Sequence, residues 1–163
     1  MSIPVITLIG KSGSGKTTLL EKLVVALKTR QYRIATIKHH SHNGFDIDVP
    51  GKDSWRFAQA GSDHAIIAAP DKIASYKKLK RELSLEEILP MVSEVDLILA
   101  EGYRQAHLPT IEILRSQHYA KLIADTDDLI AIVSDLKFDL PVAQFALEDV
   151  KGITDLIEQL FLH

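Results

Sequence analysis

The chain has 163 residues, 46% of them hydrophobic and 25% charged, which excludes a disordered or fibrous class and suits one globular domain over 1–163. The formal net charge of −3 gives no overall attraction to nucleic acid or anionic lipid, and the absence of cysteine excludes disulfides and thiolate zinc sites. Because the N-terminus lacks a signal-peptide pattern and no apolar run reaches the ~20 residues of a membrane helix, we expect a cytoplasmic protein that binds neither nucleic acid nor membrane.

Hydrophobic periodicity predicts strands that alternate with helices. In the first half the pattern predicts a strand over 3–9, a helix over 16–30, a strand over 32–37, an irregular polar segment over 38–54, a helix over 54–60, a buried strand over 65–69 and an edge strand over 73–76. In the second half it predicts a helix from the capping box at 84 to about 93, strands over 95–100, 111–114, 129–133 and 142–145, and a helix over 150–161. Such a series indicates a three-layer α/β fold: a mostly parallel, twisted sheet with helices on both faces.

A phosphate-binding loop stands between the first strand and the first helix. The residues Gly10, Lys11, Ser12, Gly13, Ser14, Gly15, Lys16 and Thr17 fit the spacing G-x-x-x-x-G-K-[ST]. Glycine permits the backbone conformations that turn amides inward, and a side chain there would hold phosphates away from the backbone. Lys16 would supply charge to the β/γ-phosphates, the Thr17 hydroxyl would join a Mg²⁺ shell, and the helix N-terminus at Thr18 would face the same anion. The loop predicts a P-loop NTPase fold that binds a nucleotide; the alternative is a turn that only joins strand to helix.

A carboxylate and a glycine, Glu101 and Gly102, end the apolar strand over 95–100. Glu101 would hold a metal-bound water or the Thr17 hydroxyl, and Gly102 would let the backbone approach the γ-phosphate. The alternative is that both residues serve only a turn. In a parallel sheet the strand ends at Gly10, Lys38 and Glu101 open on one crevice, where such folds bind ligands.

The irregular segment over 38–54 concentrates imidazoles and carboxylates, namely His39, His40, His42, Asp46 and Asp48. Three interpretations stay open: a solvated surface loop, a segment that folds over phosphate and Mg²⁺, or a separate metal site. We choose Asp48 as the carboxylate that reaches the magnesium through water and acts with Lys16 in catalysis, which would make this segment a nucleotide-sensitive switch.

Other residues have less specific interpretations. Lys11 could contact the nucleotide of a partner subunit or be a variable loop position, and Asp135 could read a guanine base although the usual N/T-K-x-D motif is missing. The basic run 77–81 is a solvated turn or a contact for an acidic partner. The motif segments contain no clear arginine finger and no water-orienting glutamine, so hydrolysis should be slow.

Four segments together resemble the MobB family: 10–19, the Lys-His-His run from Lys38, the Asp-x-Pro-Gly-Lys-Asp-Ser run from Asp48, and Glu-Gly-Tyr from Glu101. The resemblance implies a dimeric P-loop protein that binds GTP, hydrolyses it slowly and acts as an adapter beside the enzyme that attaches GMP to molybdopterin. It carries the phosphate site to Gly10 through Thr17, the switch carboxylate to Asp48 and the second acidic element to Glu101.

The chain departs from the family pattern at two positions. Arg104 stands where the family often has lysine after an aromatic residue, and an arginine fork does not replace a point charge one for one. Thr110 follows Pro109 where lysine is common, which removes the contact of that lysine.

We therefore expect a GTP-binding adapter of molybdenum cofactor biosynthesis that uses Mg²⁺, with weak GTPase activity at most. Its partners would be a guanylyltransferase-type enzyme of the same pathway and a second copy of itself. The alternatives are a small-molecule kinase that uses ATP and Mg²⁺, and a non-enzymatic protein that uses the loop only for structure. Preference for GTP over ATP follows from the resemblance alone.

Overall fold

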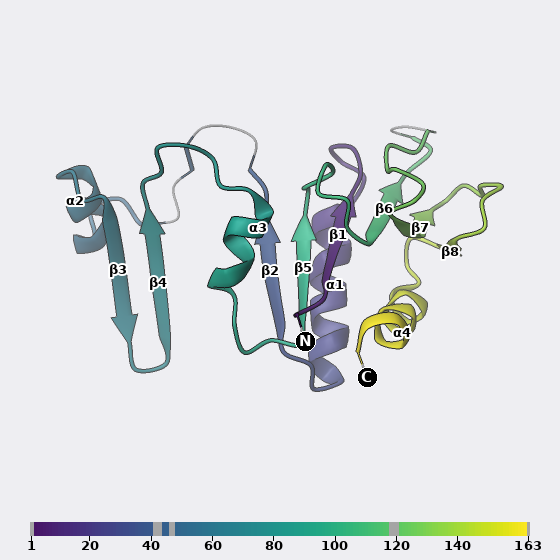
Figure 1. Ribbon diagram of the computed structural model, residues 1–163, viewed down its shortest axis with the longest axis horizontal. Helices are drawn as coiled ribbons and strands as arrows, with labels where there is room; N and C mark the ends of the chain where they lie inside the picture. Colours follow the sequence, from purple (N-terminus) through teal and green to yellow (C-terminus); the bar gives the residue numbers. More distant parts are fainter. Residues whose placement is uncertain (1, 41–43, 46–47, 118–120, 163) are drawn as a thin grey trace. The chain divides into compact units, whose positions relative to one another are not determined.

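The computed structural model describes residues 2–40, 44–45, 48–117 and 121–162. Their contacts divide the chain into two compact units (Figure 1). Unit 1 comprises Met1–His39 and Leu85–His163, and unit 2 comprises His40–Ser84. The single domain expected over 1–163 stays a prediction. No helix among the described residues is long and apolar enough to cross a membrane.

Unit 1 contains a six-stranded sheet in the order β2-β5-β1-β6-β7-β8, in which every neighbouring pair is parallel (Figure 1). The strands are β1 Val5–Ile9, β2 Ile34–Lys38, β5 Leu97–Glu101, β6 Thr110–Leu114, β7 Leu129–Ser134 and β8 Ala143–Phe145. All six were expected from the sequence within a few residues. The parallel arrangement follows from their near-continuous apolar composition, since both faces of the central strands are buried.

Helices cover both faces of this sheet. The helices α1 Lys16–Thr29 and α4 Val150–Phe161 pack on one face, where Leu23 of α1 and Ile157 of α4 join the same core cluster as Ile6 of β1. Because side chains alternate along a strand, the neighbouring Val5 belongs to a second cluster on the opposite face. Packed against that cluster are Leu89 of the 3-10 helix η1 Leu89–Met91, which follows the one-turn α3 Leu85–Ile88, and Val92 and Val95 after it. The three-layer α/β P-loop fold is thus confirmed.

The helix predicted over 84–93 is shorter than expected. Only Leu85–Ile88 is α-helical, and the next three residues form the 3-10 turn that contains Pro90. Proline has no backbone N–H and its ring crowds the preceding turn, so the α-helical hydrogen bonds cannot continue through it.

Strand β6 carries a buried carboxylate. Glu112 is 1% exposed, and its two oxygens accept hydrogen bonds from the amides of Ile123 and Ala124 at 2.8 to 3.0 Å. Burial raises the pKa of Glu112, and these backbone donors oppose the shift. The carboxylate therefore ties the loop that precedes β7 to the sheet.

Unit 2 has a separate antiparallel sheet of two strands, β3 His64–Ala69 and β4 Lys72–Lys77, with α2 Asp53–Gln59 packed against β3. The prediction of a buried strand over 65–69 was wrong on burial, because Ala65 is the only buried residue of β3. An apolar run favours a strand, but it does not decide what covers that strand. Among the described residues β3 pairs with β4 alone, and apart from Ala65 and the half-buried Tyr76 the side chains on both faces of the hairpin stay exposed.

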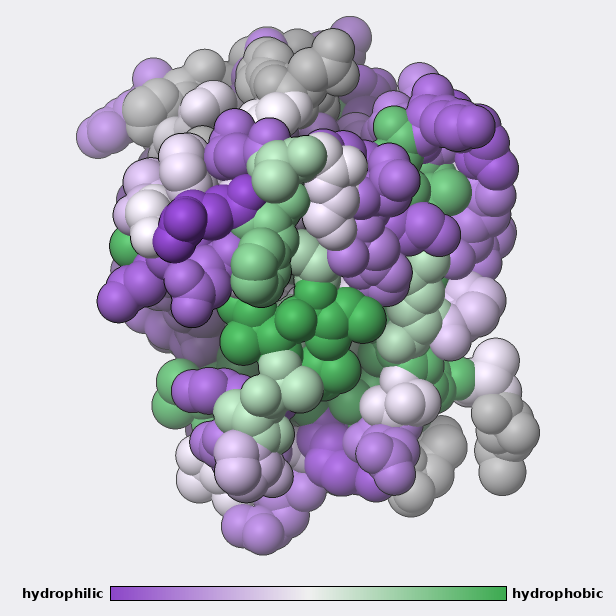
Figure 2. Space-filling model, turned by 90° about the vertical axis from the view of Figure 1, so that its left-hand side faces the viewer, coloured by the Kyte–Doolittle hydropathy of each residue, from purple (hydrophilic) through white to green (hydrophobic). Residues whose placement is uncertain are grey.

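Large apolar side chains are exposed on this hairpin, including Ile66, Ile67 and Ile73 at 56%, 46% and 70%. Figure 2 shows a contiguous hydrophobic area ringed by hydrophilic residues on the face that is turned to the viewer. Exposed apolar patches of this kind mark interaction surfaces more often than they occur by accident.

Candidate functional site

Three strand ends meet at one edge of the unit 1 sheet. Leu8 of β1 and Lys38 of β2 both lie in register with Glu101 at the end of β5. Since the strands are parallel, Gly10, which follows β1, opens on the same edge as Lys38 and Glu101. The structure thus brings together the segments that we expected at one crevice.

The phosphate loop connects β1 to α1 and is closed by its own lysine. Lys16 Nζ donates hydrogen bonds of 2.9 Å to the carbonyl oxygens of Gly10 and Lys11. Gly15 is the N-cap residue in the left-handed conformation, with no side-chain cap. In the described chain no protein acceptor is recorded for the amides of Lys16, Thr17 and Thr18. These amides, with the positive end of the helix dipole, form a site suited to an anion.

Two glycines of the loop are required by their surroundings. Gly10 has φ +153°, and a Cβ there would lie 2.3 Å from the carbonyl oxygen of Ile113 in β6. Gly15 has φ +99°, and a Cβ there would lie 3.3 Å from the guanidinium of Arg115. Both positions use the freedom of glycine, and at both the crowding comes from β6 and the residue after it.

Thr17 and Glu101 are in contact, as predicted. The Thr17 hydroxyl donates to Glu101 Oε2 at 3.2 Å, and Lys38 Nζ lies 3.8 Å from Glu101 Oε1. The Glu101 side chain is 15% exposed, so its carboxylate is held at the mouth of the site rather than in bulk water. A hydroxyl and a carboxylate side by side are oxygen ligands of the type that Mg²⁺ prefers, so this donor set fits the metal.

Gly102 follows with φ +97°, and a Cβ there would lie 2.9 Å from Cβ of His39. The His39 ring also lies 4.9 Å from the ring of Tyr103, measured between centroids. Packing of His39 is therefore sufficient reason for a glycine at position 102. The predicted approach of the Gly102 backbone to a phosphate stays a prediction.

Asp48 belongs to unit 2, whereas the phosphate loop belongs to unit 1, so its role toward a metal ion at the loop stays a prediction. Its Oδ1 accepts a hydrogen bond of 2.8 Å from the Val49 amide, while Oδ2 is buried with no partner among the described residues. His42 and Asp46, which would be metal ligands under one of the three interpretations of this segment, lie outside the described residues. His40 lies in unit 2, with its ring 5.9 Å from that of Phe45.

Arg115 is a site residue that we did not single out from the sequence. It follows β6 directly, and its Nε donates a hydrogen bond of 2.9 Å to the carbonyl oxygen of Ser14 in the phosphate loop. The available signal was positional: the residue after a strand that neighbours β1 in a parallel sheet ends beside the loop.

Asp135, the candidate base-reading carboxylate, has partners in the protein. It accepts hydrogen bonds of 2.6 Å from the Ser116 hydroxyl and 2.8 Å from the Ser116 amide. These hydrogen bonds lower the pKa of Asp135. The carboxylate would have to exchange them before it could read a base.

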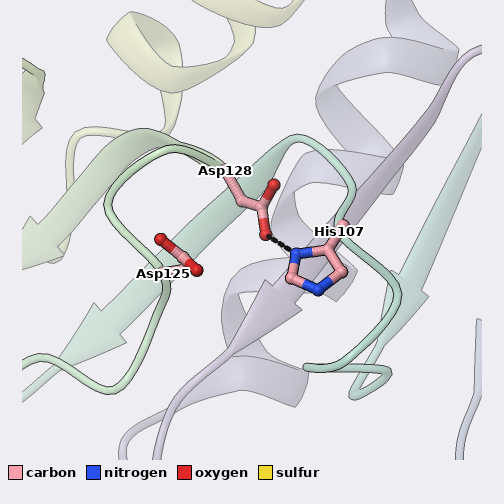
Figure 3. Close-up of side chains that lie close together, drawn as sticks. All are labelled: His107, Asp125 and Asp128. Atoms are coloured by element: carbon pink, nitrogen blue, oxygen red, sulfur yellow. Dashed lines mark hydrogen bonds and ion pairs between the residues drawn. The ribbon is translucent and has the colours of Figure 1, made fainter.

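A second cluster of ligand-type residues lies at the other edge of the sheet. His107 lies before β6, and the two aspartates, Asp125 and Asp128, lie before β7 (Figure 3). All three are therefore at the amino ends of strands. His107 Nδ1 lies 3.1 Å from Asp128 Oδ2, and Asp125 Oδ1 accepts from the Asp127 amide at 3.2 Å. A hydrogen bond between His107 and Asp128 and a local turn at Asp125 account for this cluster, and its location separates it from the phosphate loop.

The comparisons with known proteins agree on one family. The family model for "Molybdopterin guanine dinucleotide synthesis protein B" (MobB) matches residues 5–135. The chain is 34% identical to the "Molybdopterin-guanine dinucleotide biosynthesis adapter protein" of Haemophilus influenzae, covering 99% of this chain and 91% of the relative. It is 35% identical to the protein of the same name from Escherichia coli, covering 95% and 91%.

Solved structures agree with the sequence comparison. A crystal structure of molybdopterin-guanine biosynthesis protein B superposes with a TM-score of 0.74 at 26% identity, covering 96% of this chain and 99% of that one. Bacillus subtilis MobB superposes with a TM-score of 0.76 at 24% identity, covering 96% and 97%, which supports the fold. The phosphate loop, the paired Thr17 and Glu101, and a family match over most of the chain lead to one conclusion: the chain belongs to the MobB family.

Proposed function

We propose that this protein is a GTP-binding adapter in molybdopterin-guanine dinucleotide biosynthesis, with Mg²⁺ as cofactor and slow GTP hydrolysis. The observation that carries the nucleotide site is the start of α1, where three successive amides have no recorded partner in the described chain and Lys16 spans the loop. The names of the two curated relatives support the pathway and the adapter role.

Each residue of the site then has a physical task. The amides from Gly15 to Thr18 bind the phosphates, and Lys16 exchanges its two carbonyl partners for phosphate oxygens. Thr17 and Glu101 would hold Mg²⁺, one by its hydroxyl and the other directly or through water. Bound Mg²⁺ neutralises phosphate charge. We keep Asp48 as the switch carboxylate, because its buried Oδ2 lacks a described partner.

Slow hydrolysis follows from what surrounds the phosphates. Fast phosphoryl transfer requires a positioned nucleophile and a cation that stabilises the transition state. Arg115 is bonded to a loop carbonyl, and the motif segments offer no water-orienting glutamine. A rate of several turnovers per second by the isolated protein would contradict this proposal.

A homodimer is supported by the unit 2 hairpin. Of the ten exposed large hydrophobic residues that are recorded among the described residues, three (Val25, Met91, Leu160) lie in unit 1 and the other seven lie between Phe45 and Leu79 in unit 2. An isolated two-stranded hairpin is marginal in water, and its unpaired edges invite pairing with another strand. We propose a second copy as the occupant, because the same hairpin supplies both the apolar faces and the strand edges that the first copy needs.

The direct test is calorimetry with GTP and ATP, with and without Mg²⁺. We expect GTP to bind more tightly with Mg²⁺, Lys16→Ala to abolish binding, and Lys28→Ala, at the exposed end of the same helix, to leave it unchanged. Glu101→Gln should remove most of the gain from Mg²⁺ while leaving Mg²⁺-free binding nearly intact. Unchanged affinity in Lys16→Ala would mean that the loop serves only structure.

Two further outcomes decide between alternatives. ADP formation that depends strictly on an added acceptor would favour a small-molecule kinase. Pull-down of the pathway's guanylyltransferase-type enzyme in a GTP-dependent manner would support the adapter role. The cytoplasmic location stays a prediction.

A further inference from the structure

The guanidinium of Arg115 is hydrogen-bonded to a peptide bond within the phosphate loop, the one between Ser14 and Gly15. Its Nε donates a 2.9 Å hydrogen bond to the Ser14 carbonyl oxygen, across 101 residues of sequence. The bond is part-buried, and Ser14 itself is 2% exposed. Such a charge-assisted hydrogen bond, partly shielded from water, holds its acceptor more firmly than a surface contact does.

The position of this bond determines where the next amide points. In a trans peptide the carbonyl and the N–H point in opposite directions. Arg115 holds the Ser14 carbonyl on its own side of the loop, so the Gly15 amide of the same peptide is directed away from Arg115. A cation on the carbonyl also polarises the peptide, which strengthens the N–H as a donor.

Glycine at position 15 is part of this arrangement. A Cβ there would lie 3.3 Å from Arg115 Nη2, so the guanidinium would have to shift by a few tenths of an ångström. The left-handed φ of +99° further restricts the position to glycine. The close approach of Arg115 and the conformation of Gly15 therefore depend on each other.

The guanidinium has few competing partners. It borders a shallow depression lined by Gly15, Thr18, Leu147 and Glu148, among others. Glu148 and Asp135 both lie close enough to Arg115 to interact with its charge. Each is hydrogen-bonded to another residue, Glu148 to Lys22 at 2.6 Å and Asp135 to Ser116, and the side-chain hydrogen bond described for Arg115 goes to Ser14.

We propose that Arg115 is a positioning residue for nucleotide binding: through the Ser14 carbonyl it fixes the Gly15 amide toward the phosphates. This inference rests on the proposed nucleotide site. Because Arg115 acts through the phosphate loop, its effect should follow the polyphosphate and be independent of the base.

The test compares the wild type with Arg115→Ala and Arg115→Lys. We expect both variants to bind Mg²⁺-GTP on the order of tenfold more weakly, the loss typical of one charge-assisted hydrogen bond. Inorganic pyrophosphate, competing against a fluorescent nucleotide, should lose affinity by the same factor. Arg33→Ala is the matched control. It removes the same charge and a bidentate hydrogen bond, from Arg33 to Asp96, that is not part of the phosphate loop.

A spectroscopic measurement separates positioning from a general loss of structure. In NMR spectra of the amide groups of nucleotide-free protein, the Gly15 resonance should shift in Arg115→Ala and stay in place in Arg33→Ala. The remaining resonances should stay dispersed, which shows that the variant is folded. If Arg115→Ala lacks a dispersed spectrum, Arg115→Lys alone decides, and it should show the same Gly15 shift and weaker binding.

Four results would overturn the inference while leaving the proposed function intact. The first two are wild-type affinity for Mg²⁺-GTP in Arg115→Ala, or in Arg115→Lys, where it would show that the charge alone matters. The others are a loss of affinity for GTP without a loss for pyrophosphate, and a Gly15 resonance that is unshifted in both variants. Failure of the wild type to bind GTP or pyrophosphate would overturn both proposals together.

Discussion

Replacement of Ile66 by lysine tests the proposed dimer at the centre of the exposed hairpin. Ile66 is 56% exposed in the single chain, and its cross-strand partner is Ser75. Full burial of an isoleucine side chain contributes about 1.5–3 kcal/mol, so covering the exposed half contributes roughly 0.8–1.7 kcal/mol per copy. A symmetric dimer buries the residue twice, so the substitution should weaken the free energy of dimerisation by roughly 1.5–3.5 kcal/mol. This corresponds to a dissociation constant that is roughly ten to a few hundred times higher.

Lysine adds the cost of removing its charge from water, so this range is a lower bound. Sedimentation velocity over a series of protein concentrations measures the dissociation constant directly. The control is Val25→Lys, which makes the same change in charge at a residue of α1 in unit 1 that is 67% exposed. A wild-type protein that is monomeric at every concentration, or an Ile66→Lys protein that associates as tightly as the wild type, would refute the assignment of this surface.

Three further predictions concern stability. The hydrogen bonds from Arg33 hold the pKa of Asp96 at about 2, so the ionised carboxylate stabilises the fold at neutral pH and this stabilisation is lost as pH falls from about 4 through 2. In thermal melts the melting temperature of Asp96→Asn should therefore lie below that of the wild type at pH 7 and equal it near pH 2. A difference in melting temperature that does not change with pH would contradict this reasoning. Leu23→Ala, at a fully buried position of α1, should lower the free energy of unfolding by about 2–5 kcal/mol in urea titrations, and a loss under 1 kcal/mol would mean that the site refills. Gly10→Ala places a Cβ 2.3 Å from a strand carbonyl and should lower both stability and GTP affinity, whereas Gly61→Ala, at φ +112° in open space, should cost only the backbone strain, about 1–3 kcal/mol, and leave GTP affinity unchanged.

Much of the fold was predictable because its determinants are local. The apolar strands and the helical spacing of Leu19, Leu23 and Leu27 identify elements without knowledge of their neighbours. The phosphate loop is likewise a contiguous run whose conformation depends on glycines within it. The contact of Thr17 with Glu101 was also expected, since parallel strands bring their carboxyl ends to one edge.

The two errors have different causes. The run over 65–69 forms a strand as predicted, but its burial depends on what packs against it, and among the described residues β3 pairs with β4 alone. The helix over 84–93 is interrupted by Pro90, which lies within the predicted segment and is a local signal that outweighs the capping pattern. Only the first error therefore reflects tertiary context.

By itself the sequence determined the order of strands and helices, the location of the proposed anion site and the family, because each is encoded in short segments or in a linear series of motifs. Only the tertiary structure decided that Arg115 meets the Ser14 carbonyl, that Glu112 is buried against the amides of Ile123 and Ala124, and that the β3–β4 hairpin is open on both faces. These features depend on strand register and on contacts between residues far apart in the chain. Side-chain type and spacing carry no direct record of either.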